Sequence, residues 1–315
     1  MSVARLIARA AAIATLLVGG ASPQAQDFGA VEIQTLHVHD NVYMLFGAGG
    51  NTTVQAGSEG LLVVDTQFAP LADRLYDAAA KLSEGPLRYI INTHMHGDHI
   101  GGNARLRQLA PGTAVEPLLV IAHLNAYTRL VQLEREDPDL VPEGSLPADS
   151  FDTDQTDFHF NGEAVLLHYA PNAHTDGDII VHFRRSDVIA TGDVFVSGGY
   201  PFIDIDNGGS VQGIIDALNF ILALAVPAET QEGGTLIVPG HGRICDEADV
   251  VEYRDMVVII TERIQDMIDR GMSLREIQRA RPTLDYDTEY VNDNSFVSAE
   301  RFVEAIYQSL AGTRQ

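Results

Sequence analysis

The chain has 315 residues, of which 45% are hydrophobic, and its 44 acidic residues outnumber 20 basic ones for a formal net charge of −24. This composition supports a globular core and excludes a disordered tail. The acidity argues against a nucleic-acid binder, because phosphates would be repelled over most of the surface. Cys245 is the single cysteine, so the chain has neither an intramolecular disulfide nor a multi-cysteine metal site.

The N-terminus has the pattern of a secretory signal peptide. Arg5 and Arg9 precede an apolar run at 10–18, and small residues follow it. The run is shorter than the about 20 apolar residues that span a bilayer. We therefore expect cleavage after Ala21 or Ala25 and a periplasmic or secreted protein, with an uncleaved N-terminal anchor as the alternative. No later segment is apolar enough to cross a membrane.

The first half of the remaining chain mixes short strands with helices, bounded by glycine-containing turns. In chain order the predicted elements are strands at Val31–His39, Val42–Phe46 and Leu61–Val64, a helix over about 71–82, a strand at Arg88–Asn92, a helix near 103–110 and a strand at Leu118–Ile121. The stretch Pro138–Ala148 is rich in proline and acidic residues, which predicts a surface loop within the domain.

The second half repeats the order of strands and then helices. It predicts strand-rich stretches at Phe151–Ala170 and Ile179–Thr191, a glycine-rich loop at 192–209, a helix from the N-cap Ser210 through Ala225, a short strand at Leu236–Val238 and mostly helix from about residue 247. Two halves of sheet plus helix, packed face to face, are thus expected within a single domain over residues 26–315.

The loop at 93–99, directly after a predicted strand, carries the strongest chemical signal. It holds His94, His96, Asp98 and His99 within six residues. Neutral imidazole and carboxylate together are ligands for zinc, and also for iron or manganese. The sequence therefore predicts a site for one or two metal ions at this strand end.

Four further residues stand at predicted strand ends or in glycine-containing turns, where a side chain projects from a rigid sheet. They are Asp65, His174, Asp193 and His241. With the loop at 93–99, this ordered set resembles the metallo-β-lactamase-fold hydrolase superfamily, to about residue 245. The resemblance implies a four-layer αββα sandwich of class α/β.

The resemblance also implies a site for two divalent metal ions, with zinc favoured. His94, His96 and His174 would bind the first ion, Asp98, His99 and His241 the second, and Asp193 both. Asp65 would hydrogen-bond the histidine loop and fix its shape. Thr175 would act similarly beside His174.

The chemistry implied by such a site is hydrolysis. A hydroxide held by the two ions would attack the carbonyl carbon of an ester, lactone, thioester or lactam. Asp98 would manage a proton for the leaving group. The sequence has no Gly-x-Ser-x-Gly or Ser-x-x-Lys motif, so water is the expected nucleophile.

Several functions of the superfamily remain open. A class B β-lactamase usually has Cys or Ser at the position of Asp193 and often a lysine three residues later, where this chain has Val196. A glyoxalase II-like thioesterase fits the ligand set, but fits export and the shortage of cations less well. The di-iron flavoprotein branch, which has glutamate at the position of His96, is disfavoured. A mononuclear-iron sulfur dioxygenase and a non-catalytic periplasmic metal-binding protein are further alternatives.

The sequence says less about the substrate, which we expect to be a small molecule. The loop at 200–209 mixes aromatic, apolar and acidic residues and follows Asp193 closely. Tyr200 and Asp204 on this loop, and Arg243 beside His241, are candidate substrate contacts. An acidic side chain in the cleft would favour an uncharged or cationic substrate. The sequence does not predict the oligomeric state.

Overall fold

The computed structural model describes residues 27–110, 112–113, 116–291 and 295–312. The expected signal peptide therefore lies outside the described residues, and its cleavage stays a prediction, as do the domain limits. Within the described ranges, every helix is too short or too polar to cross a bilayer.

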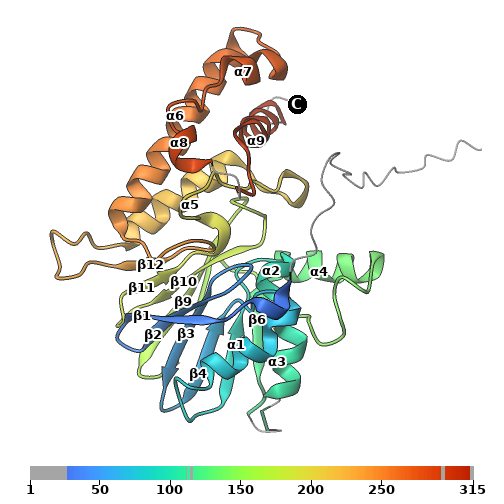
Figure 1. Cartoon of the computed structure of the whole chain (residues 1–315), viewed down its shortest axis with the longest axis vertical. Coiled ribbons are helices and arrows are strands. Elements are labelled where there is room, and N and C mark those ends of the chain that lie inside the picture. Colours follow the sequence, from blue (N-terminus) through green and yellow to red (C-terminus); the bar gives the residue numbers. More distant parts are fainter. Residues whose placement is uncertain (1–26, 111, 114–115, 292–294, 313–315) are drawn as a thin grey trace, which may run out of the picture.

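Two sheets form the centre of the molecule (Figure 1). The seven strands of the first sheet lie in chain order: β1 (Gln34–His39), β2 (Val42–Phe46), β3 (Thr52–Gly57), β4 (Gly60–Val64), β5 (Leu87–Ile91), β6 (Leu119–His123) and β7 (Asp149–Phe151). Neighbours are antiparallel up to β4 and parallel from β4 to β7. The carboxyl ends of β4, β5 and β6 therefore share one edge.

The second sheet has five strands in the order β12 (Leu236–Val238), β11 (Val188–Ala190), β10 (Asp178–Phe183), β9 (Glu163–Ala170) and β8 (Gln155–Phe160). Only the β11–β12 pair is parallel among these described strands. The chain thus runs through one sheet, then the other.

Helices cover the outer face of each sheet and follow several strands directly. Those of the first half are η2 (Ala69–Leu71), α1 (Ala72–Ala79), α2 (Gly97–Ile100), α3 (Asn103–Leu109) and α4 (Leu124–Glu136), after the N-terminal η1 (Phe28–Ala30). Those of the second half are η3 (Gly192–Val194), η4 (Ile205–Asn207), α5 (Val211–Leu224), α6 (Glu247–Asp269), α7 (Leu274–Ala280), α8 (Asp287–Tyr290) and α9 (Ala299–Gly312).

Alternating side chains of the strands explain the layers. On β4, Leu61 and Val63 pack toward α1 and α3, whereas Leu62 and Val64 pack between the two sheets. A third apolar cluster joins the outer face of the second sheet to α5, α6 and α9. The expected four-layer αββα sandwich is confirmed, with the C-terminal helices projecting beyond the second sheet (Figure 1).

The helix predicted after Ser210 is also confirmed, because the Ser210 hydroxyl accepts a hydrogen bond from Gly213 N at 2.9 Å. Helix α4, ahead of the predicted loop at 138–148, has no counterpart among the predicted elements. His123 begins it by accepting a hydrogen bond from Asn125 N at 3.3 Å, and histidine is not a residue that sequence patterns associate with an N-cap.

Candidate metal centre

The candidate ligands come together at one edge of the sandwich, from loops that follow four different strands. His94, His96, Asp98 and His99 follow β5, and His174 lies between β9 and β10. Asp193 is in η3 after β11, and His241 follows β12. Loops at strand ends hold side chains on a rigid support, so the topology explains how residues so distant in sequence meet.

Asp65, at the end of β4, ties the histidine loop to the first sheet. Its Oδ1 accepts a hydrogen bond from Thr93 N at 2.8 Å, and its Oδ2 accepts from the Thr93 hydroxyl and from His99 Nδ1, each at 2.7 Å. Asp65 has a φ of +63°, a left-handed conformation that is uncommon outside glycine, although aspartate adopts it more readily than most residues. Such backbone strain is kept where the surrounding contacts hold it.

The hydrogen bonds fix which nitrogen of each ring carries the proton. The Thr93 hydroxyl donates to Asp65, so its oxygen accepts from Nδ1 of His94 at 3.0 Å. The Phe202 carbonyl accepts from Nδ1 of His174 at 2.6 Å. Each ring therefore turns its other nitrogen, with a free lone pair, toward the cluster.

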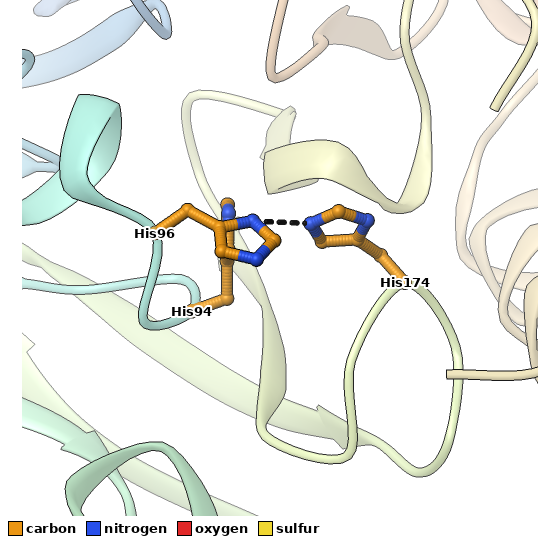
Figure 2. Close-up of side chains that lie close together, drawn as sticks. All are labelled: His94, His96 and His174. Atoms are coloured by element: carbon orange, nitrogen blue, oxygen red, sulfur yellow. Dashed lines mark hydrogen bonds between the residues drawn. The ribbon is translucent and has the colours of Figure 1, made fainter. Parts of the chain in front are cut away.

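His96 and His99 follow the same rule. Nε2 of His96 donates to Oδ2 of Asp204 at 2.8 Å, and Nδ1 of His99 donates to Asp65. The His94 ring lies 4.8 Å from the His96 ring and 4.7 Å from the His174 ring, between centroids. Figure 2 shows the resulting convergence of His96 and His174, whose Nδ1 and Nε2 atoms lie 2.9 Å apart. Two lone pairs this close repel one another unless a cation or a proton lies between them.

The second group gathers around the carboxylates of Asp98 and Asp193. Nε2 of His241 lies 3.3 Å from Asp98 Oδ2 and 3.5 Å from Asp193 Oδ1. Asp193 Oδ1 is also 3.2 Å from Nε2 of His99, while its Oδ2 lies 3.8 Å from Nε2 of His174. The Asp193 carboxylate thus faces both groups, one oxygen toward each.

These side chains fit metal ions. Three sets have their ligand atoms within 4.8 Å of one another: His94, His96 and His174; His94, His99 and Asp193; and Asp98, His99 and His241. Nε2 of His94 is buried and makes no hydrogen bond to a described residue, which is costly unless a ligand satisfies it. A metal-binding histidine usually donates a hydrogen bond from its other ring nitrogen to a carbonyl or carboxylate, as His96, His99 and His174 do.

The electrostatics of the cluster favour cations. Burial lowers the pKa of His174 to about 4 and that of His94 well below its ordinary value, so both rings are neutral, as a metal ligand must be. Burial also opposes protonation of His99, but Asp193 and Asp65 outweigh it and raise its pKa well above the ordinary value. His99 therefore lies where the carboxylates attract positive charge, either a proton or a metal ion.

Glycine allows the last ligand loop to approach Asp193. A Cβ atom at Gly240 would lie 2.0 Å from Oδ1 of Asp193 and 2.6 Å from the backbone of Gly192. No side chain fits there. The glycine before His241 is therefore required by the packing of this loop against the Asp193 turn.

A cavity of about 840 Å³ opens over the cluster. Its polar side is formed by His96, Asp98, Asp193 and His241. This volume lies within the range of small-molecule sites.

Of the three expected substrate contacts, Tyr200 is among the residues that line the cavity, and Asp204 and Arg243 are not. Although it lines the cavity, Tyr200 is only 2% exposed, and its hydroxyl donates a hydrogen bond to Oδ1 of Asp287 at 3.0 Å. Asp204 is not among the lining residues, because its carboxylate accepts hydrogen bonds from His96 and Asn207. Burial would raise the Asp204 pKa, but these bonds outweigh it and lower the pKa to about 2.

Arg243 does not fit a substrate role. Its guanidinium is bound to the carboxylate of Asp249, at 2.5 Å from Nη2 to Oδ1, and Arg243 does not line the cavity. A capping box at the start of α6 holds Asp249 in place. The arginine therefore fixes the loop after His241 to α6.

The roles of Asp178 and of the Phe202 carbonyl, both of which position His174, were not identified from the sequence. Asp178 accepts hydrogen bonds from Thr175 N at 2.7 Å and from the Thr175 hydroxyl at 2.9 Å. It thereby fixes the turn that carries His174, and Thr175 acts through it. The Phe202 carbonyl orients His174, but a backbone acceptor has no sequence signal.

The model of the Metallo-beta-lactamase superfamily matches residues 45–242. The chain belongs to the metallo-beta-lactamase superfamily. Members of this superfamily are metal-dependent hydrolases that typically bind two metal ions, and the matched range contains all seven candidate ligands.

Curated relatives within the superfamily match only part of the chain. A hydroxyacylglutathione hydrolase from Gloeobacter violaceus is 30% identical over 145 residues, which are 46% of this chain and 47% of that protein. Another from Pelagibacter ubique is 30% identical over 113 residues, 36% of this chain and 38% of that protein. The matches thus span less than half the length of either relative.

Solved structures show the fold at lower identity. The sec-alkylsulfatase Pisa1 from Pseudomonas sp. superposes with a TM-score of 0.64 at 16% identity, covering 88% of this chain and 50% of that one. A metallo-beta-lactamase from Pontibacter korlensis has a TM-score of 0.54 at 16% identity and covers 72% of this chain and 99% of that one.

Proposed function

We propose that the protein is a periplasmic dinuclear metal hydrolase that splits the acyl bond of an uncharged ester or lactone. The observation that carries the proposal is the convergence of unprotonated ring nitrogens and two carboxylates, with the opposite ring nitrogens of four histidines held by hydrogen bonds. Because these side chains are held by hydrogen bonds and their cluster borders an open cavity, the site is more typical of a catalytic metal site than of a structural one, whose coordination is closed.

The proposed ligands are His94, His96 and His174 for one ion, Asp98, His99 and His241 for the other, and Asp193 for both. When bound, the ions would activate water and stabilise the negative charge that develops on the substrate oxygen. We propose zinc because the set consists of imidazoles and carboxylates, which are common zinc ligands; iron- and manganese-loaded forms are the alternatives to be tested.

The residues of the chain account for the remaining steps. Water adds its oxygen to the carbonyl carbon, the bond to the leaving oxygen breaks, and one proton of the water ends on the leaving alcohol. Asp98 lines the cavity beside the ligand cluster, and we assign its carboxylate the transfer of that proton. The hydrogen bonds that His99 donates to Asp65 and His96 donates to Asp204 keep both rings in position throughout.

Charge narrows the substrate class. Among the described residues that line the cavity there is no lysine or arginine, and the guanidinium of Arg301 is packed over the rings of Phe202 and Phe296. The lining itself therefore offers no lysine or arginine to an anionic group of the substrate. This weighs against glutathione thioesters, the substrates named for the curated relatives, and against the carboxylate of a β-lactam. Both remain weaker candidates than an uncharged ester or lactone.

The test is a substrate panel assayed with the zinc-loaded and the metal-free chain. We expect metal-dependent hydrolysis of 4-nitrophenyl acetate and of a simple lactone, faster than that of a glutathione thioester or nitrocefin. Metal analysis of the same preparation should give two ions per chain. If the zinc-, iron- and manganese-loaded forms all leave the whole panel intact, the hydrolase proposal fails and a metal-binding role replaces it.

Export is tested separately. The full chain expressed in a Gram-negative host should appear in the periplasmic fraction, with a mature N-terminus at residue 22 or 26. A cytoplasmic protein that keeps Met1 would contradict the proposed location without affecting the hydrolase proposal.

A further inference from the structure

The cavity over the ligand cluster has two chemically different sides. Its apolar lining is formed by Phe68, by Val196, Tyr200 and Phe202 of the segment after Asp193, and by Phe296 and Val297. The last two come from the C-terminal part of the chain, beyond the range 45–242 that matches the superfamily model. This apolar wall is therefore supplied in part by a segment outside the range matched by the superfamily model.

Phe296 is the most exposed large apolar residue of those described, at 71%. Its ring meets that of Phe202 edge to face at 5.3 Å between centroids. The Arg301 guanidinium packs over both rings, at 5.3 Å from Phe296 and 5.8 Å from Phe202, and donates to the Phe296 carbonyl at 3.0 Å. Phe296 is thus held at the cavity with most of its surface open and continues the apolar patch begun by Phe202; a contiguous exposed apolar patch marks binding sites more often than a single residue does.

The apolar wall begins directly at the proposed metal ligands. The Phe202 ring lies 5.9 Å from the ring of His96 and 5.5 Å from that of His174, between centroids. A substrate whose carbonyl group lies over the cluster would therefore place its adjoining carbon chain against Phe202 and then Phe296. Burying apolar surface in this way gains free energy in proportion to the area covered.

Glycines keep the space between the two sides open. Gly198 and Gly199 line the cavity, and a Cβ atom at either position would meet no other heavy atom within 4 Å. Gly199 has no left-handed φ, so its backbone accepts a side chain without strain. The position is therefore suited to an experiment that fills the cavity.

We propose that Phe202, Phe296 and Val297 form a binding surface for an apolar acyl chain, so that the preferred substrates are uncharged esters or lactones of medium-chain acids. The proposal rests on the hydrolase function proposed above and names its substrate class. The absence of lysine and arginine from the described lining agrees with an apolar rather than an anionic substrate arm.

The kinetic test compares 4-nitrophenyl octanoate with 4-nitrophenyl acetate on the zinc-loaded chain. We expect kcat/KM to be higher for the octanoate. Phe296→Ala and Gly199→Leu should each lower kcat/KM for the octanoate about tenfold, which corresponds to losing about half of the burial free energy of a large apolar side chain. Both variants should affect hydrolysis of the acetate less than that of the octanoate, so the octanoate-to-acetate ratio of kcat/KM should fall in each.

Phe220→Ala is the matched control. Phe220 is also a partly exposed phenylalanine, at 38%, but it lies on α5 and does not line the cavity. This variant should keep the wild-type ratio of octanoate to acetate. A change as large as that of Phe296→Ala would show that the ratio reports general loosening of the protein, and would overturn the proposal.

Calorimetric titration with 1-octanol gives a readout that needs no turnover. The wild-type chain should bind the alcohol with a negative heat-capacity change, the signature of apolar burial, and Phe296→Ala and Gly199→Leu should bind it more weakly. Equal kcat/KM for octanoate and acetate with no octanol binding overturns the apolar surface and leaves the hydrolase proposal standing. Octanol binding that depends on Phe296, without hydrolysis of either ester, supports the surface and overturns the hydrolase proposal.

Discussion

The two groups of proposed ligands differ in how firmly the protein holds them. In the first group His94 and His174 are fully buried, and all three rings are fixed by a hydrogen bond from the nitrogen that faces away from the centre. In the second group the side chain of His241 is 37% exposed, and no described residue holds its Nδ1. Preorganised ligands lose less freedom on binding, so the first group should bind its ion more tightly.

Removal of metal is the strongest test of this difference. Stepwise dialysis against a chelator should release one ion per chain well before the other, and complete removal should abolish hydrolysis, which added zinc restores. Metal analysis at each step gives the stoichiometry. Simultaneous loss of both ions would show that the two groups are equally firm, and activity that survives complete removal would contradict a metal-dependent reaction.

Asp193→Ala should give the next largest effect, because its carboxylate faces both groups. We expect at most one ion per chain and a fall in kcat/KM of about a thousandfold, the equivalent of the several kcal/mol attributed to the stabilisation of developing charge by metal ions. Two ions retained in this variant would rule out a shared carboxylate. The control is Asp206→Ala, an acidic change on the nearby loop outside the cavity lining.

Aspartates behind the ligands allow the two groups to be compared directly. Asp204 holds His96 alone among the proposed ligands, whereas Asp65 holds His99 directly and His94 through the Thr93 hydroxyl. Asp204→Asn should therefore weaken the first ion only, and Asp65→Asn both, by about 10–100-fold each. Competition with a chromogenic chelator measures the affinity for each ion. If both variants weakened the binding of the same ions to the same extent, Asp204 and Asp65 would not hold different groups of ligands.

The candidate ligands could be predicted from sequence because the strands and loops that carry them have strong local signals, whereas their division between two ions was implied by the family resemblance. Apolar runs end at Asp65 and before Thr93, and histidine, aspartate and glycine cluster directly after them. Ligation needs those residue types at strand ends whatever the substrate. The sandwich could be predicted for the same reason, since alternating and continuous apolar runs specify which face of each strand is buried.

The contacts around the ligands were harder to predict because they depend on tertiary packing. Asp204 looked like a substrate contact from its place on an aromatic and acidic loop, yet its carboxylate turns back to His96. Arg243 stands beside His241 in sequence, but α6 presents Asp249 to it. Phe296 lies nearly a hundred residues from Phe202, and no local pattern indicates that the two rings meet.

The smallest expected effect concerns the turn that carries His174. Thr175→Ala removes the hydroxyl that donates to Asp178 Oδ1 at 2.9 Å and accepts from Gly177 N at 3.1 Å. Both partners are buried, so the unsatisfied carboxylate oxygen should lower the free energy of unfolding by about 1–3 kcal/mol. Urea denaturation of the metal-free chain measures this loss without a contribution from bound ions.

The serine variant separates the hydrogen bond from the packing of the methyl group. Thr175→Ser keeps the hydroxyl and should retain most of the stability lost in Thr175→Ala, together with the wild-type affinity for the first ion. If both variants were equally destabilised, the methyl group rather than the Asp178 hydrogen bond would hold the turn. Because Asp178 also accepts from the Thr175 backbone at 2.7 Å, neither variant should release His174 completely, and both should still bind the ion of the firmer group.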